Sequence, residues 1–347
     1  MVILSVSCSS NDVKVVVVQP QGLAGSGIVS WLSFSESGFY IALGGGRING
    51  KSFDGIAIYD CTKDKIVLIW EPQDWNSNVY GEAVAFHPFN SSFVFCCDQE
   101  HVGLVNWKEG KKIFRLPIEH GFVSGVAFSK DGSCVFVIHS FFAEKKPEGW
   151  NEEKQGPFCI AEILKIDIES QKIVKKIIVD NNKIHGVDFN PNRNLVALRY
   201  LNGKAEIWDL EEGRCLKQVQ HFHGDKCIKF IDDDTFLTDG FPRSGTATGV
   251  YGNVILWNLK TGTPIRKFSI HSMDLNGGIG ILYDKKGNKY ILSSGNDNYA
   301  KLWNLDTGKI IWSKYYKNGV KIGVSPDGKK GIISTNKDNF LIYLESQ

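Results

Sequence analysis

The sequence lacks several patterns that identify common classes of protein. It contains no run near the roughly 20 apolar residues that a membrane-spanning helix needs. Its eight cysteines are scattered, with no Cys-x-x-Cys pair and no spacing typical of zinc ligands. We therefore expect a protein without a membrane span or a metal site, whose cysteines are reduced, mostly buried thiols in the cytoplasm.

Signatures of catalysis are also absent. There is no GxSxG, HExxH or P-loop motif, and no dinucleotide fingerprint follows a βα pattern. The glycines of Gly44 to Gly46 are not followed by a helix, whose N-terminus phosphate sites use. The 40 basic and 38 acidic residues give a net charge of +2, too small to attract nucleic acid or an anionic membrane. These absences favour a protein that is not an enzyme and has no cofactor, nucleic-acid partner or membrane partner.

What the sequence does contain is a repeated string. Three stretches, EIWDLEEGRCL, ILWNLKTGTPI and KLWNLDTGKII, share an apolar residue, Trp, Asp or Asn, Leu, two polar residues and Gly. Asp or Asn hydrogen-bonds its own backbone and Gly accepts positive φ, which together close a tight hairpin. The full set of apolar-Asx steps is Tyr59-Asp60, Val105-Asn106, Ile166-Asp167, Trp208-Asp209, Trp257-Asn258 and Trp303-Asn304. Such repetition indicates an architecture built from one unit.

A second marker, an apolar alternation followed by a polar turn, precedes each of these steps. Its last large apolar residues are Phe34, Phe86, Phe128, Phe189, Phe230, Tyr283 and Val324. Because the two markers interleave along the chain, each unit is predicted to hold four antiparallel strands in about 40 or more residues.

These units resemble the Trp-Asp (WD) repeat. The resemblance is strongest at Trp208-Asp209, Trp257-Asn258, Trp303-Asn304 and Ser325 to Gly328, whereas other residues replace the Trp in the first three units. It implies an all-β fold, a seven-bladed β-propeller of four-stranded antiparallel blades, with residues 1–347 as a single domain. It also implies a non-enzymatic scaffold that binds a protein or peptide partner.

The seventh unit is short by one strand. Strands are expected near Lys321 to Val324, Gly331 to Thr335 and Phe340 to Leu344, after which the sequence offers no fourth. An apolar stretch at Val13 to Val18 offers the missing strand. Because a three-stranded blade would leave an open edge, we predict that the N-terminal strand closes the last blade.

Two features near the repeats have competing interpretations. His221, His223 and Cys227 are close enough to suggest a metal site, but WD repeats often carry a His at the position of His221 that hydrogen-bonds within its blade. The resemblance therefore implies that His221 pairs with Thr238 or the ring nitrogen of Trp257. By the same resemblance, Asp297 anchors the turn between the second and third strands of its blade.

The central channel is the alternative functional site. Asp188 and Lys229 each precede a marker Phe, at equivalent positions of neighbouring blades. They suggest either an ion pair or an acid/base couple, and the ion pair is the favoured interpretation. With His185 and Lys321 they would be the candidate residues of a propeller enzyme or a small-ligand binder.

Three insertions distinguish this chain from a plain repeat. They fall between the second and third strands of blades 1, 3 and 5, at Gly44 to Gly55, Ser140 to Phe158 and Gly240 to Gly252. All should rise from one face, where binding or local capping of blade edges are the two alternatives. The candidate partner-binding residues are the aromatic and Arg residues Arg47, Phe141, Phe142, Trp150, Phe158, Phe241, Arg243 and Tyr251. We expect a monomer or a subunit of a hetero-complex.

Overall fold

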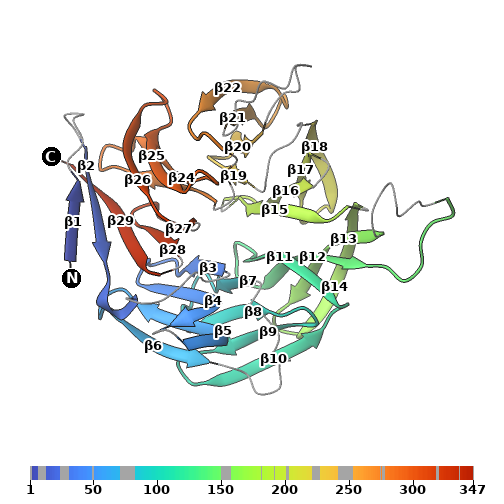
Figure 1. The fold of residues 1–347 in the computed structure, drawn as a ribbon. Coiled ribbons are helices and arrows are strands. Elements are labelled where there is room, and N and C mark those ends of the chain that lie inside the picture. The colour runs from blue at the N-terminus through green and yellow to red at the C-terminus, as the bar shows by residue number, and fades with distance from the viewer. Residues whose placement is uncertain are drawn as a thin grey trace.

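A sheet of short strands with two apolar faces needs a neighbouring sheet on each side. In this protein the sheets are arranged in a ring, so every sheet has two such neighbours. The computed structural model describes residues 2–6, 13–23, 31–48, 51–70, 83–149, 158–180, 182–190, 192–200, 203–220, 227–240, 253–273, 275, 278–317, 320–335 and 337–346. Seven antiparallel sheets surround a central axis (Figure 1). The expected all-β, seven-bladed propeller is confirmed.

Blades 1 to 3 follow one another along the chain, each with its first strand innermost. Blade 1 contains β3 (Trp31–Phe34), β4 (Tyr40–Ile48), β5 (Lys51–Asp60) and β6 (Lys65–Trp70). Blade 2 contains β7 (Ala83–Phe86), β8 (Phe93–Cys97), β9 (His101–Asn106) and β10 (Lys111–Pro117). Blade 3 contains β11 (Gly121–Phe128), β12 (Cys134–Phe142), β13 (Cys159–Asp167) and β14 (Lys172–Asp180).

Blades 4 to 6 repeat this order. Blade 4 contains β15 (Ile184–Phe189), β16 (Leu195–Tyr200), β17 (Lys204–Asp209) and β18 (Arg214–Gln220). Blade 5 contains β19 (Ile228–Phe230), β20 (Thr235–Asp239), β21 (Asn253–Asn258) and β22 (Pro264–Ser269). Blade 6 contains β23 (Ile279–Tyr283), β24 (Lys289–Ser294), β25 (Tyr299–Asn304) and β26 (Ile310–Tyr315).

The last blade combines both ends of the described chain. Its inner strands are β27 (Val320–Val324), β28 (Gly331–Thr335) and β29 (Asn339–Ser346), and β2 (Val13–Gln19) pairs with β29. The predicted closure by the N-terminal strand is therefore confirmed. A fifth strand that the sequence analysis did not predict, β1 (Val2–Val6), pairs with the outer edge of β2 (Figure 1). A short 3-10 helix, η1 (Gln21–Leu23), leads from β2 towards blade 1.

The extra strand covers an outer edge that carries little charge. The outer strands β6, β10, β14, β18, β22 and β26 together carry twelve Lys or Arg residues and one acidic residue. Lysine on an edge strand discourages pairing with other chains. The sequence of β2, VKVVVVQ, has a single lysine, and its edge is the one that β1 occupies.

The hydrophobic core is divided among the interfaces between blades. Seven clusters of buried residues are found, and each joins two neighbouring blades. The cluster between the first and last blades packs Phe34 and Tyr59 against Ile332 and Leu341. Every blade thus buries both of its faces, which explains why its strands are apolar without strict alternation.

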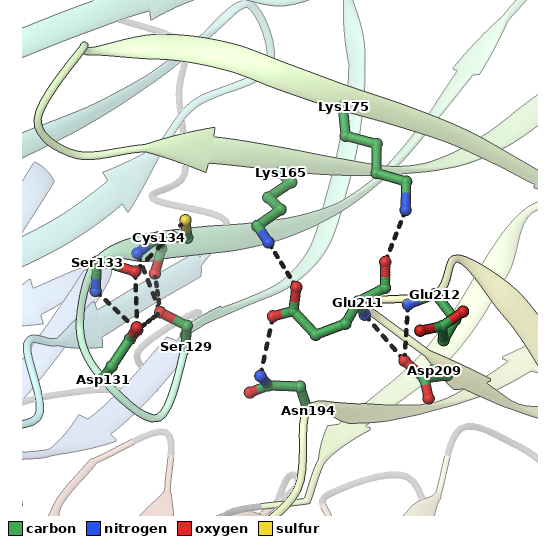
Figure 2. Close-up of polar contacts among 10 residues, drawn as sticks. All are labelled: Ser129, Asp131, Ser133, Cys134, Lys165, Lys175, Asn194, Asp209, Glu211 and Glu212. Atoms are coloured by element: carbon green, nitrogen blue, oxygen red, sulfur yellow. Dashed lines mark hydrogen bonds and ion pairs between the residues drawn. The ribbon is translucent and has the colours of Figure 1, made fainter.

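Hydrogen bonds of short polar side chains set the turns between first and second strands. Asp131 accepts hydrogen bonds from the Ser129 hydroxyl at 2.6 Å and from the Ser133 backbone N–H at 3.0 Å (Figure 2). The bond from Ser129, followed by those from Ser133, lowers the pKa of Asp131 to about 2. The equivalent turn of blade 7 places Gly328 at φ +64°, with its Cα beside the ring of Tyr283. A side chain there would collide with Tyr283 of blade 6.

Blade 6 holds a buried chain of polar groups that extends from Trp303 to Asp297. Trp303 Nε1 donates to Ser293 Oγ at 3.0 Å, and the same oxygen lies 2.9 Å from His271 Nε2. The His271 Nδ1 atom lies 2.9 Å from Asp297 Oδ1. The carboxylate also accepts the Tyr299 N–H at 3.1 Å, so Asp297 anchors the turn before β25, as expected from the WD resemblance.

Candidate functional site

Blade 3 has, on average, the longest strands of the described four-stranded blades. Its strands contain 8, 9, 9 and 9 residues, and β12 pairs with β13 as far as Phe142 and Cys159. Beyond that pair, the Ala143 N–H donates to the Phe158 carbonyl at 3.1 Å. The predicted insertion from Ser140 to Phe158 therefore begins as strand rather than loop, because its first apolar residues continue the pairing.

The predicted insertion of blade 1 is likewise part of the sheet. Strands β4 and β5 pair as far as Ile48 and Lys51, so the segment from Gly44 to Gly55 forms a hairpin rather than an open loop. Arg47 pairs with Ser52 in this ladder. The register shifts between Gly44 and Gly46, where the intervening glycine has a φ of +48°. Glycine permits this bulge, which the sequence pattern did not reveal.

An aromatic and cationic cluster lies at the end of blade 3 that carries the strand 2 to strand 3 connection. We call this side of the ring the insertion face. Phe142 has 51% of its surface exposed and contacts Phe122 edge-on, with ring centroids 5.8 Å apart. Lys183 Nζ lies 3.4 Å from the centroid of Phe122. This Phe142 cluster (Phe122, Phe142 and Lys183) offers a partner apolar surface and a positive charge together.

Buried polar contacts hold the base of the cluster in place. The ring of Phe141 stacks on His139, with centroids 5.4 Å apart, and His139 Nδ1 lies 3.0 Å from Glu162 Oε1. Both His139 and Glu162 are buried. The Ile184 N–H, next to Lys183, donates to Ser140 Oγ at 3.4 Å. These contacts tie blade 3 to the first strand of blade 4, so the exposed rings rise from a rigid support.

The remaining candidates on this face divide into two groups. Phe158 is 8% exposed, so its side chain packs inside the blade and cannot be a primary contact for a partner. The other four, Trp150, Phe241, Arg243 and Tyr251, lie outside the described residues, as does His221. In blade 5, Trp257 Nε1 donates to Thr238 Oγ1 at 3.0 Å, which is the pair that His221 was expected to join. Among the described residues, no group of His, Cys, Asp or Glu could hold a metal ion.

The channel candidates form the ion pair that the sequence analysis favoured. Lys229 Nζ lies 2.6 Å from Asp188 Oδ1, and Asp188 Oδ2 accepts the Phe230 N–H at 2.7 Å. Burial raises the pKa of Asp188, while the charge of Lys229 opposes the rise. Both carboxylate oxygens are occupied, which leaves Asp188 poorly placed to act as a general base.

Asp188 of this pair borders a hollow on the opposite side of the ring. We call this side the turn face because it carries the turns between first and second strands. The hollow has a volume of about 820 Å³ and is bordered by Asp188, Phe128 and Phe89, the last with 73% of its surface exposed. His185 lies three residues before Asp188 on β15, roughly 10 Å away at 3.3 Å per residue. The structure therefore separates His185 from the pair rather than forming one site.

Comparison with known proteins agrees with the fold. None of the known family profiles matches the chain. Among curated proteins, it is 24% identical over 199 residues to telomerase protein component 1 of Rattus norvegicus, covering 46% of the chain and 7% of that protein. It is 25% identical over 173 residues to a guanine nucleotide-binding protein subunit beta-like protein of Encephalitozoon cuniculi, covering 49% of the chain and 46% of that protein. It is 27% identical over 164 residues to protein transport protein SEC31 of Yarrowia lipolytica, covering 43% of the chain and 13% of that protein.

These relatives are WD-repeat proteins. Their similarity to the chain agrees with the seven-bladed ring and with the hydrogen-bonded chain that begins at Trp303. The chain is a seven-bladed β-propeller that is similar to WD-repeat proteins. It spans less than half the length of each of the relatives it matches. No helix among the described residues is long and apolar enough to cross a membrane.

The structure shows two residues at the candidate site of this propeller that sequence reasoning missed. Phe122 and Lys183 were not candidates, because neither lies in an insertion: one belongs to β11 and the other directly precedes β15. Phe122 pairs with Ser140 across β11 and β12, which places it beside the predicted segment.

Proposed function

We propose that this propeller is a non-enzymatic scaffold that binds a protein or peptide partner on the insertion face, with the Phe142 cluster as the anchor. The observation that carries the proposal is the exposure of Phe142 beside Phe122 and Lys183, on a support fixed by buried hydrogen bonds. Large aromatic rings and cationic side chains dominate the energy of many protein interfaces. The relatives are WD-repeat proteins, a class that generally acts as scaffolds, which supports this role.

The proposal also includes the candidate residues of the insertions in blades 3 and 5. Trp150, Phe241, Arg243 and Tyr251 lie outside the described residues, in sequence segments that we assign to the insertions of blades 3 and 5. We assign them to the rim of the site, together with Arg47 of the blade 1 hairpin. In such an arrangement the central rings supply most of the binding energy, and the rim excludes water and adjusts specificity.

The cysteines agree with a cytoplasmic location, which is also part of the proposal. The seven described cysteines are all free, and five of them are buried. Secreted proteins usually pair their cysteines in disulfides. Within the cytoplasm we expect the protein to act as a monomer or as a subunit of a hetero-complex.

The test uses two exposed phenylalanines on opposite faces. Wild-type protein should be used as bait in an extract of its source cells, and the enriched proteins identified by mass spectrometry. Capture of the main partner should then be repeated with Phe142→Ser and with the matched control Phe89→Ser on the turn face. Removing Phe142 should weaken binding by about 1.5 to 3 kcal/mol, whereas removing Phe89 should not.

The opposite result would identify the alternative site. If Phe89→Ser abolishes capture and Phe142→Ser does not, the partner enters the hollow beside Asp188 and the proposed site is wrong. If both variants capture normally, the insertion face and the hollow are both excluded as the main contact.

A further inference from the structure

The outer strand of blade 3, β14 (Lys172–Asp180), is an unusual edge. It has nine residues, whereas β6, β10, β18, β22 and β26 have six or seven. Its sequence, KIVKKIIVD, contains neither Pro nor Gly, while β10 ends and β22 begins with proline. Among the described residues, no strand pairs with its outer edge. Its backbone therefore offers a long row of donors and acceptors, with register shifts against β13 at Val174 and Val179.

One side of β14 is fixed against blade 4. Lys175 Nζ donates to the Glu211 carbonyl at 2.7 Å, and Lys165 of the adjacent strand lies 2.6 Å from the Glu211 carboxylate (Figure 2). Ile177 lies so close to the same turn that a Cβ on Gly213 would be 2.9 Å from its Cδ1 atom. These contacts hold the middle of the strand in position against blade 4.

Four other side chains of β14 are exposed, two of them charged and two apolar. They are Lys172, Val174, Lys176 and Ile178. Val174 has 54% and Ile178 has 57% of its surface accessible. Among the described outer strands, β14 alone has two aliphatic side chains that are each more than half exposed. An added strand could cover both of them while it completes the backbone hydrogen bonds.

The protein already shows such an addition at another blade. Strand β1 pairs antiparallel with the outer edge of β2, from Val2 opposite Gln19 to Val6 opposite Val15. The outer edge of a blade in this ring can therefore accept a fifth strand without disturbing the four beneath it. The edge of β14 is two residues longer than that of β2.

Charge selects the kind of strand that would fit. Blade 2, the neighbour of blade 3, also has a lysine-rich outer strand, β10, with exposed Lys111 and Lys112. The one acidic residue of β14, Asp180, is paired with Lys204. A second copy is a poor occupant, because an antiparallel pairing of two β14 strands that puts Val174 opposite Ile178 also puts Lys176 opposite itself.

We propose that the outer edge of β14 binds an extended segment of a partner protein, which carries both acidic and apolar residues, as a fifth strand of blade 3. Main-chain hydrogen bonds supply affinity in this mode of recognition, and the alternating side chains supply specificity. The acidic residues lie against Lys172 and Lys176, and the apolar residues cover Val174 and Ile178. This site is separate from the Phe142 cluster and does not depend on it.

The test uses a synthetic probe, since no natural segment is specified. A fluorescein-labelled, nine-residue peptide of alternating glutamate and valine is titrated with the full-length protein, and binding is followed by fluorescence anisotropy. A lysine and valine peptide of the same length is the charge control. Two further probes carry N-methyl groups on every second residue, one in each phase, because methylation removes the N–H donors of one strand edge.

Protein variants locate the site. Lys172→Glu combined with Lys176→Glu should weaken binding of the acidic peptide by about tenfold or more, since two favourable cross-strand pairs become repulsive. The matched control is Lys260→Glu with Lys267→Glu, which makes the same change of charge at two exposed lysines of blade 5. A further variant, Val174→Ser with Ile178→Ser, should weaken binding without any change of charge. Thermal midpoints show whether each variant is folded.

The outcomes separate strand pairing from simple charge attraction. The proposal requires that the acidic peptide binds, that the lysine peptide does not, and that at least one methylated probe fails to bind. It is overturned if the acidic peptide does not bind at millimolar concentration or if both methylated probes bind as well as the parent. It is also overturned if the blade 5 control loses as much affinity as the β14 variant, since the peptide would then sense only overall charge.

Discussion

Lys229 Nζ lies 2.6 Å from Asp188 Oδ1, so an ion pair links the innermost strands of blades 5 and 4 where they face the channel. The Asp188 side chain is 12% exposed and that of Lys229 is 31% exposed, so water reaches the lysine more than the carboxylate. Removing the lysine should therefore leave a buried carboxylate without its main counter-charge.

The first prediction follows from this pair. Lys229→Met should lower the free energy of unfolding by about 2 kcal/mol at pH 7, while the double variant with Asp188→Asn should recover most of the loss. Asparagine keeps the acceptor for the Phe230 N–H and removes the charge. Urea unfolding measures both effects. A double variant that is less stable than Lys229→Met would contradict the role assigned to the pair.

The pH dependence of that variant has a definite sign. Burial raises the pKa of Asp188 in the folded protein, and loss of Lys229 should raise it further. The folded state then binds a proton more readily than the unfolded state, so stability falls as pH rises from the unfolded pKa to the folded one. The loss of unfolding free energy caused by Lys229→Met should therefore be small near pH 4 and reach its full size at pH 7. A deficit that is the same at both values would show that charge burial is not its cause.

The effect of Asp297 on stability should depend on pH in the opposite direction. Burial alone would raise the pKa of Asp297, but the hydrogen bond to His271 and further hydrogen bonds hold it well below its usual value. Its stabilising effect is therefore present above the unfolded pKa, near 4, and is lost as pH falls towards the folded pKa. Asp297→Asn should cost about 2 kcal/mol at pH 7 and show less loss of stability on acidification than wild type. Asp306→Asn, on an exposed turn of the same blade, is the control.

Two phenylalanines of blade 3 should respond differently to truncation. Phe158→Ser should lower the free energy of unfolding by about 3 kcal/mol, because its ring is buried, while Phe142→Ser should change it by less than about 1 kcal/mol. Thermal denaturation of the two variants checks this directly. A large loss for Phe142→Ser would favour the alternative in which this ring caps a blade edge and binds no partner.

The two N-terminal strands, β1 and β2, should contribute unequally to the stability of the fold. Deleting residues 1–12 removes β1 and exposes the edge of β2, so we expect self-association with a modest change in thermal midpoint. Deleting residues 1–20 also removes β2 and its buried Val13, Val15 and Val17 from the cluster between blades 6 and 7. That deletion should lower the midpoint sharply or prevent folding. Light scattering and calorimetry measure these effects, and equal midpoints for the two deletions would contradict ring closure by β2.

The sequence by itself determined the repeat, the number of blades and the closure of the ring. Each marker residue, from Phe34 to Val324, ends the innermost strand of its blade, because the alternation and the turn residues after it are local signals. The ion pair of Asp188 and Lys229 was also readable, since equivalent positions of neighbouring repeats must lie side by side. Local patterns that recur along the chain carry this information without any knowledge of distant contacts.

Only the tertiary structure decided the details that define the sites. It showed that Phe158 is buried while Phe142 is exposed, although both flank one insertion, because exposure depends on which neighbouring strand covers each ring. It brought Phe122 and Lys183 together from two different blades. It also left the outer row of β14 uncovered while β1 covered β2. The physical reason is common to all three: burial, ring contacts and edge pairing are set by segments far apart in the chain, and local sequence does not specify which of them meet.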